Sequence, residues 1–104
     1  MISSLEKLLG TPRDGALLRY SLGLEYAKAG EHERAIGYLR EAVTRDPLYS
    51  AAWKALGKQL AESNRPDEAL EAYRLGIEAA RKKGDKQAEK EMTVFARRLE
   101  KGRG

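Results

Sequence analysis

Two repeated stretches decide the fold: YSLGLEYAKAG at residues 20–30 and KALGKQLAESN at residues 54–64. They begin 34 residues apart, and each carries a Leu-Gly pair, Leu22-Gly23 or Leu56-Gly57, inside a pattern that is typical of a helix. A glycine in the interior of a helix costs about 1 kcal/mol relative to alanine. We therefore interpret both glycines as points where two helices approach so closely that a side chain would not fit.

The composition favours a small helical protein. The chain has 104 residues, of which 41% are hydrophobic and 35% charged, with three prolines and no cysteine. This length predicts one domain, and the excess of Ala, Leu, Glu, Lys and Arg over β-branched residues favours helices. The N-terminus lacks the basic and apolar regions of a secretory signal, and no apolar run is long enough to span a membrane. We therefore expect a cytoplasmic protein that does not bind membranes.

Apolar residues recur at intervals of three and four along most of the chain. With the turn residues between them, they predict helices at about residues 3–9, 12–29, 31–45, 48–63, 66–83 and 85–101. Ser3 and Glu6 fit a capping box for the first helix, and Thr11-Pro12 fits the start of the second. The expected apolar stripe of the second helix consists of Ala16, Leu17, Tyr20, Leu24 and Ala27, broadened by Leu18 and Leu22. Short connections make neighbouring helices antiparallel.

The 34-residue offset extends beyond the two Leu-Gly pairs. It also relates Ala35 to Ala69 and Leu39 to Tyr73, and it pairs Gly30 with Asn64, two residues that tolerate a left-handed helix end. Self-similarity at this period, with one helical hairpin per unit, is typical of a helical repeat array.

On these residues the chain resembles the tetratricopeptide repeat (TPR) family. The first unit, residues 16–49, supplies Leu22, Gly23, Tyr26, Gly30, Ala35, Leu39, Ala42 and Pro47. The second unit, residues 50–83, supplies Trp53, Leu56, Gly57, Leu60, Asn64, Ala69 and Tyr73. The first unit departs from the family at Arg19, which replaces a tryptophan, and the second at Gly76 and Arg81, which replace an alanine and a proline.

The resemblance implies an all-α fold in which antiparallel helical hairpins stack as a short right-handed solenoid. Residues 1–15 then form an N-terminal helix and turn before the two repeats. Residues 84–104 form a capping helix and a basic tail. Because the second unit lacks the terminating proline, its second helix is expected to run on to about Lys83.

The resemblance also implies a module that binds a peptide segment of a partner protein in a concave groove. By the family's geometry, the first helix of each unit lines this groove, and the candidate binding residues are Leu17, Tyr20, Leu24, Lys28, Lys54 and Lys58. An apolar floor with lysines predicts a ligand that has both apolar and acidic groups. The carboxylate clamp of the chaperone-binding branch is absent, since Tyr20, Leu24 and Ala55 stand at its positions.

Two alternatives to the peptide-binding hypothesis remain at this stage. The domain could self-associate as an assembly scaffold without a separate peptide ligand, so a monomer or a weak homodimer is expected. The net charge is +4, and basic residues crowd the last quarter of the chain. That distribution makes weak binding of an anion or a nucleic acid through the last helix the second alternative, although a nucleic-acid partner is expected less than a protein partner.

The sequence offers little for catalysis. Its only histidine, His32, lies in a hairpin turn between Glu31 and Glu33, where a solvated side chain is expected. No glycine-rich phosphate loop, paired-histidine metal motif or nucleophile elbow is present. We therefore expect neither enzyme activity nor a cofactor or metal site.

Overall fold

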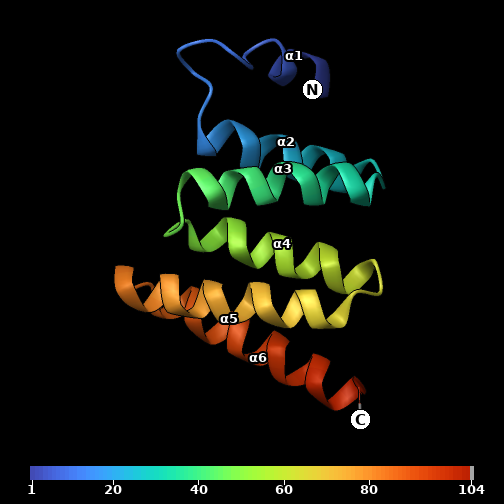
Figure 1. Ribbon diagram of the computed structural model, residues 1–104, viewed down its shortest axis with the longest axis vertical. Coiled ribbons are helices and arrows are strands. Elements are labelled where there is room, and N and C mark those ends of the chain that lie inside the picture. Colours follow the sequence, from blue (N-terminus) through green and yellow to red (C-terminus); the bar gives the residue numbers. More distant parts are fainter. Residues whose placement is uncertain (104) are drawn as a thin grey trace.

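Six helices follow one another and form a single stack. The computed structural model describes residues 1–103, and the Arg103 side chain and Gly104, at the end of the expected basic tail, lie outside what it describes. The helices are α1 (Ile2–Glu6), α2 (Ala16–Lys28), α3 (His32–Arg45), α4 (Ser50–Glu62), α5 (Pro66–Lys83) and α6 (Lys86–Arg103). No strand occurs in the described range, and the helices succeed one another along the long axis from the N-terminus to the C-terminus (Figure 1).

Neighbouring helices pack as hairpins, with left-handed residues at the turns. The main packing partners are α2 with α3, α4 with α5, and α5 with α6. Gly30 and Gly84 have φ values of +78° and +73°, and Asn64 has a φ of +60°. Glycine and asparagine adopt this backbone at low cost, which explains why the helices before them end there.

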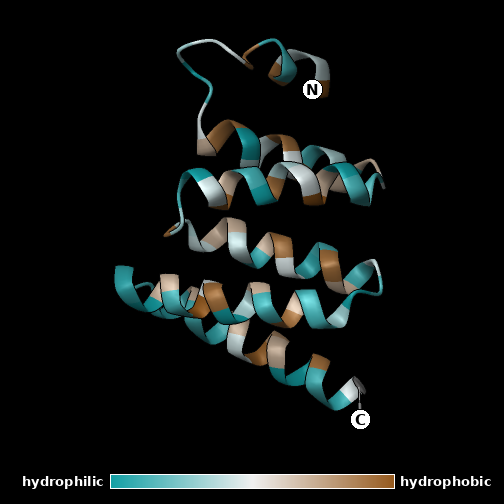
Figure 2. Ribbon diagram, viewed as in Figure 1, coloured by the Kyte–Doolittle hydropathy of each residue, from teal (hydrophilic) through white to brown (hydrophobic). Residues whose placement is uncertain are grey.

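The core runs through the whole stack. Its largest fully buried side chains are Leu22, Leu39, Leu56, Leu60 and Met92. Each of the longer helices carries alternating hydrophilic and hydrophobic bands in Figure 2, as expected for helices that bury one side. At the C-terminal end, Ala88 and Met92 of α6 are buried, and Phe95 packs on Tyr73 with ring centroids 5.9 Å apart. The last helix therefore buries one apolar face against the end of the stack.

The two Leu-Gly glycines lie where the hairpin helices meet. A Cβ added to Gly23 would come within 2.6 Å of Leu39 Cγ and 3.3 Å of the Ala35 carbonyl oxygen. A Cβ added to Gly57 would come within 2.7 Å of Tyr73 Cδ1. The distances of 2.6 and 2.7 Å are too short for real carbon contacts, so the interpretation of these glycines as close-approach positions is confirmed.

The start of the chain differs from the prediction. α1 ends at Glu6 rather than near Leu9, and no side chain caps its first turn, so the Ser3–Glu6 capping box is wrong. The Glu6 carboxylate instead accepts a hydrogen bond of 2.8 Å from the Tyr26 hydroxyl. Leu5 and Leu8 pack against the core cluster of α2, and this tertiary contact determines the local structure in place of the capping signal.

The second helix also starts later than predicted. α2 begins at Ala16 rather than Pro12, and Gly15 stands before its first residue. The Thr11 hydroxyl donates to the Leu8 carbonyl at 2.5 Å and accepts from the Arg13 amide at 3.2 Å, so Thr11 closes a turn instead of capping a helix. Threonine makes such local hydrogen bonds readily, and they compete with helix formation.

The buried face of α2 is rotated relative to the expected stripe. Leu18, Leu22 and Tyr26 are buried, whereas Leu17 is 68% exposed. The prediction that Leu17 belongs to the central stripe is therefore wrong. The sequence is apolar on two sides of this helix, so periodicity alone did not identify the buried side.

The remaining helices follow the prediction within two residues at each end. α5 continues to Lys83, as expected from the missing proline, and is 18 residues long against 14 for α3. Asp46, which precedes Pro47, has an extended backbone with φ −137° and ψ 88° and ends α3.

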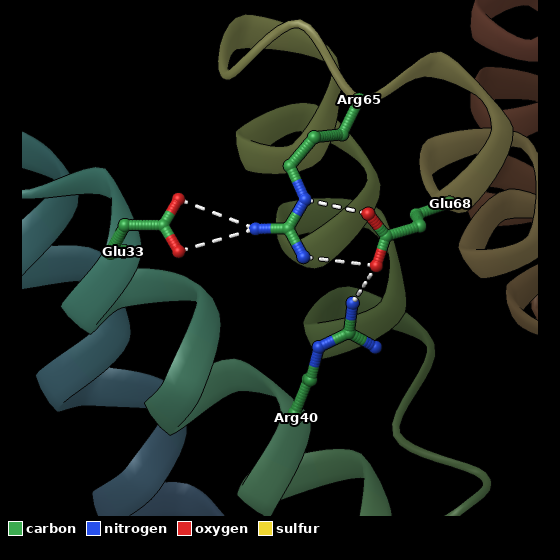
Figure 3. Close-up of polar contacts among 4 residues, drawn as sticks. All are labelled: Glu33, Arg40, Arg65 and Glu68. Carbon is green, nitrogen blue, oxygen red and sulfur yellow. Dashed lines mark hydrogen bonds and ion pairs between the residues drawn. The ribbon is translucent and has the colours of Figure 1, made fainter.

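An ion-pair network joins the second helices of the two hairpins (Figure 3). Arg65, in the turn before α5, makes a bidentate pair with Glu68 at 2.6 and 2.9 Å and also bonds Glu33 of α3 at 3.2 Å. Arg40 of α3 completes the network with a 2.9 Å bond to Glu68. The arginine partners hold the pKa of Glu68 below its usual value. The network connects α3 to α5 across the boundary between the hairpins.

Asp85 fixes the start of α6. Its carboxylate accepts hydrogen bonds from the Ala88 amide at 3.1 Å and from the hydroxyl of the buried Ser50 at 2.9 Å. These bonds, the Ala88 amide first, lower the pKa of Asp85. One carboxylate thus caps α6 and ties it to the first residue of α4.

The first prediction concerns the close approach at Gly57. Replacing Gly57 with leucine should destabilise the fold by about 1–3 kcal/mol, because the side chain would overlap the Tyr73 ring. The matched control is Gly37→Leu on α3, where an added Cβ meets nothing within 4 Å. The control should stabilise the fold by up to about 1 kcal/mol through helix propensity alone. Denaturant unfolding measures both, and equal effects of the two substitutions would contradict the packing interpretation.

The second prediction concerns the pH dependence of stability. Because the pKa of Asp85 is lower in the folded state, its ionised form stabilises the fold above about pH 4 and this contribution is lost as the pH falls through the lowered pKa. Asp85→Asn should therefore lower the melting temperature at pH 7, and its difference from the wild type should shrink towards pH 3. Glu100→Gln, an exposed change of the same charge on α6, should show no such convergence. A constant difference for Asp85→Asn would contradict the assignment.

Candidate functional site

A shallow depression lies between α2 and α4. It has a volume of about 300 Å³ and is lined by Leu24, Ala27, Lys28, Leu39, Ala55, Lys58, Gln59 and Glu62. The fully buried Leu39 of α3 belongs to its lining. The depression therefore combines apolar groups inside with charged groups from two helices at its edge.

The repeat explains how the chain builds this depression. α2 and α4 run in the same direction (Figure 1), and Leu24 and Lys28 occupy the same repeat positions as Lys58 and Glu62. Equivalent turns of the two helices therefore lie side by side. Alanine at position 55 keeps the space between the helices open.

The charged groups at this depression are only partly engaged. Lys58 is exposed, and the structure shows no carboxylate within ion-pair distance of it among the described residues. The Lys28 side chain is 76% exposed, and its only carboxylate contact in the described part of the chain is a 3.3 Å pair with Glu25. Glu62 contributes one negative charge, so the lining as a whole is positive.

His32, the first residue of α3, contacts Gln59 of the depression's lining. Its Nδ1 lies 2.7 Å from Gln59 Oε1, and the Gln59 amide nitrogen donates to Glu62 at 3.4 Å. His32 is half-buried, so the expectation of a solvated histidine is wrong. Gln59 is a buried polar residue that sequence reasoning missed, and its position opposite His32 is not marked by the 34-residue pattern.

The structure separates the six predicted site residues. It brings Leu24, Lys28 and Lys58 together at the depression. Tyr20 lies outside that lining and packs on Tyr49, with ring centroids 5.0 Å apart at 45°. Burial and the neighbouring Tyr20 raise the pKa of Tyr49.

Leu17 belongs to a different surface. It lines a second depression, of about 410 Å³, together with Leu5, Leu8, Arg13, Leu18 and Ser21 at the junction of α1 and α2. The structure therefore does not bring Leu17 together with Leu24, Lys28 and Lys58, because the N-terminal segment forms the wall beside it.

Lys54 is already paired. Its amino group bonds the Glu91 carboxylate of α6 at 2.9 Å, and this partner holds the pKa of Glu91 below its usual value. This carboxylate partner lies on another helix and is absent from the sequence-based expectations. The sequence could not reveal the partner, because the rotation of α6 about its axis determines which of its glutamates points towards α4.

Two other kinds of feature bear on function in the described range: metal sites and membrane-spanning helices. Residues 1–103 contain no group of three or more His, Asp or Glu side chains placed to hold a metal ion. None of the helices in this range combines the length and the apolar character that crossing a bilayer requires.

Known proteins resemble this chain over nearly its whole length. A TPR repeat-containing protein of Pseudomonas aeruginosa is 48% identical over 103 residues, which cover 99% of this chain and 98% of the relative. The solution structure of a Bordetella parapertussis protein has a TM-score of 0.84 at 40% identity, covering 98% of this chain and 89% of that one. The crystal structure of a Salinibacter ruber tetratricopeptide repeat domain protein has a TM-score of 0.78 at 31% identity, covering 84% and 97%.

The family profile agrees with these relatives and with the fold. The profile described as tetratricopeptide repeat matches residues 20–85, which include both Leu-Gly stretches. The predicted all-α solenoid of stacked helical hairpins is confirmed. Domains of this kind are generally protein–protein interaction modules. The chain belongs to the tetratricopeptide repeat family.

Proposed function

We propose that this protein binds a peptide segment of a partner protein in the groove formed by α2 and α4. The observation that carries the proposal is the depression with an apolar interior, where Lys28 has one carboxylate contact and Lys58 has none among residues 1–103. A binding site of this kind needs apolar area for affinity and a few polar groups that fix orientation.

The groove lining defines the chemistry of the ligand. An apolar side chain would pack on Leu24, Ala27 and Ala55, and an acidic group next to it would meet Lys28 and Lys58. Glu62 lies at the same edge, and its negative charge would repel a second acidic group of the ligand placed next to it. The expected ligand is a segment with an acidic residue adjacent to a large apolar residue.

The exposure of the lysines indicates how they would act. Lys28 and Lys58 lie at the rim, where salt screens charges effectively. Contacts of this kind influence the association rate and its salt dependence more than they influence the dissociation rate. Affinity for the ligand should come mainly from the apolar contact.

The third prediction tests this groove. A display library of random 12-residue peptides, selected on the wild-type protein, should be enriched in sequences with Asp or Glu beside Leu, Ile or Phe. In the double variant Lys28→Glu with Lys58→Glu, the enriched peptides should bind at least tenfold more weakly, because the rim now repels their carboxylates. Amide chemical shifts should map binding of the wild type to α2 and α4.

The control for this experiment is Lys7→Glu with Arg45→Glu. It makes the same change of net charge with two exposed residues outside the groove, and it should bind the peptides like the wild type. Enriched peptides without acidic residues, or shift changes confined to other helices, would contradict the proposal. A dimer without peptide binding would favour the self-association alternative, and light scattering detects it.

The fourth prediction concerns the Lys54–Glu91 pair. Glu91→Gln should release Lys54 for a ligand carboxylate and increase the affinity for peptides with two acidic residues by up to about fivefold. Peptides with one acidic residue should bind with unchanged affinity, since their single carboxylate contacts Lys28 and Lys58 and does not reach Lys54. Fluorescence anisotropy with one peptide of each kind measures the difference. A loss of affinity for the doubly acidic peptide would show that Glu91 itself supports binding.

A further inference from the structure

The outer side of α6 carries a row of basic residues. At 100° per residue, Lys86, Lys90, Arg97 and Lys101 fall within about 60° of arc on the helix surface. All four are exposed, and within residues 1–103 the structure shows no hydrogen bond or ion pair made by their side chains. The row covers about 22 Å along the helix axis, from the first residue of α6 almost to its end.

The carboxylates of α6 do little to neutralise this row. Glu89 is bound to Arg81 of α5 at 2.7 Å, and Glu91 is bound to Lys54 of α4 at 2.9 Å. Asp85 caps the helix and bonds Ser50. Glu100 is the one acidic residue of α6 that flanks the row without a partner among the described residues. Intramolecular pairing therefore leaves a net positive helix face.

Val94 is the one apolar residue that lines the depression on this face. Val94, 42% exposed, and Thr93 form a shallow depression with Lys86, Glu89, Lys90 and Arg97. The Thr93 hydroxyl is already bonded to the Glu89 carbonyl oxygen at 2.8 Å. Protein interfaces contain an apolar core with aromatic anchors, whereas a single valine and no aromatic residue line this depression. Its chemistry suits a regular array of anionic oxygens better than the side chains of a protein.

We propose that the outer face of α6 binds the phosphate backbone of duplex nucleic acid without base specificity. Duplex DNA carries one charge per about 1.7 Å of its axis when both strands are counted, so a duplex segment as long as the 22 Å row carries about 13 phosphates, more than enough for four contacts. Phe95 packs inward on Tyr73, so the row has no aromatic platform for unpaired bases. This surface lies on α6, whereas the proposed peptide groove lies between α2 and α4, so either can fail without the other.

The proposal is tested by measuring how binding depends on salt concentration. The probe is a fluorescein-labelled 20-base-pair DNA duplex of mixed sequence. Kobs is the observed association constant. With four phosphate contacts, the slope of log Kobs against the logarithm of the salt concentration should be about −3.6 for the wild-type protein. Affinity should fall about 100-fold between 50 and 200 mM salt. In Lys90→Gln with Arg97→Gln, the slope should become shallower by about 1.8, since two contacts are lost. Circular dichroism verifies that the variant keeps its helix content.

Two control variants remove the same net charge elsewhere. Lys28→Gln with Lys58→Gln alters the groove, and Lys7→Gln with Arg45→Gln alters exposed positions outside α6. Both should keep the wild-type slope. Equal slope changes in all three variants would overturn the proposal, because binding would then depend on net charge and not on α6. An unchanged slope in the α6 variant would overturn it as well.

Two further probes distinguish nucleic acid from other polyanions. Poly-L-glutamate should compete with the duplex much less well at equal charge, and vesicles of phosphatidylserine and phosphatidylcholine should not retain the protein at 150 mM salt. Equal competition by polyglutamate would assign the face to an acidic protein. Retention by vesicles together with weak binding to the duplex would assign it to an anionic membrane surface. Either result would overturn the proposal.

Discussion

The structure depends on the close contact that a missing side chain allows between packed helices. Gly23 meets Leu39, and Gly57 meets Tyr73, at distances that exclude any Cβ. The same spacing of 16 residues recurs a third time, because a Cβ on Gly76 would lie 2.5 Å from Met92 Sδ. Each glycine thus receives a large side chain from the next helix, and the three contacts link α2 to α3, α4 to α5 and α5 to α6.

The third contact shows how α6 joins a chain with two complete repeats. Gly76 departs from the family pattern, because that pattern has an alanine at this position and the first unit has Ala42 there. In the structure it is the position on which α6 packs, and a Cβ there would also come within 2.6 Å of Trp53 Cβ. A departure from the repeat pattern therefore has a packing reason that only the three-dimensional contact reveals. Met92 is fully buried as a result, and α6 closes the end of the core.

Sequence reasoning succeeded where local chemistry and tertiary packing agree. Left-handed residues such as Gly30 and Asn64 end their helices as predicted, and the 34-residue period identified the hairpins. It failed where two local preferences competed. Thr11 closes a turn instead of capping α2, and Leu17 is exposed because α2 is apolar on two sides. For the candidate site, residues of α2 and α4 line one depression, but the sequence could not reveal that Lys54 is paired, since a partner on α6 depends on the rotation of that helix.

Arginine and lysine have different roles in this molecule. Nearly all its ion pairs use arginine, and several connect helices, as Arg65 connects α3 to α5 and Arg81 connects α5 to α6. The planar guanidinium makes several fixed hydrogen bonds at once, so it suits contacts that hold the fold together. Lysines such as Lys58 and Lys90 remain exposed and without a carboxylate partner in the described range. The lysine ammonium is a mobile, strongly hydrated point charge, which suits transient contact with an external anion. Because the arginines already neutralise many of the carboxylates, both surfaces proposed to bind partners keep exposed lysines: Lys58 at the groove, and Lys86, Lys90 and Lys101 on the outer face of α6.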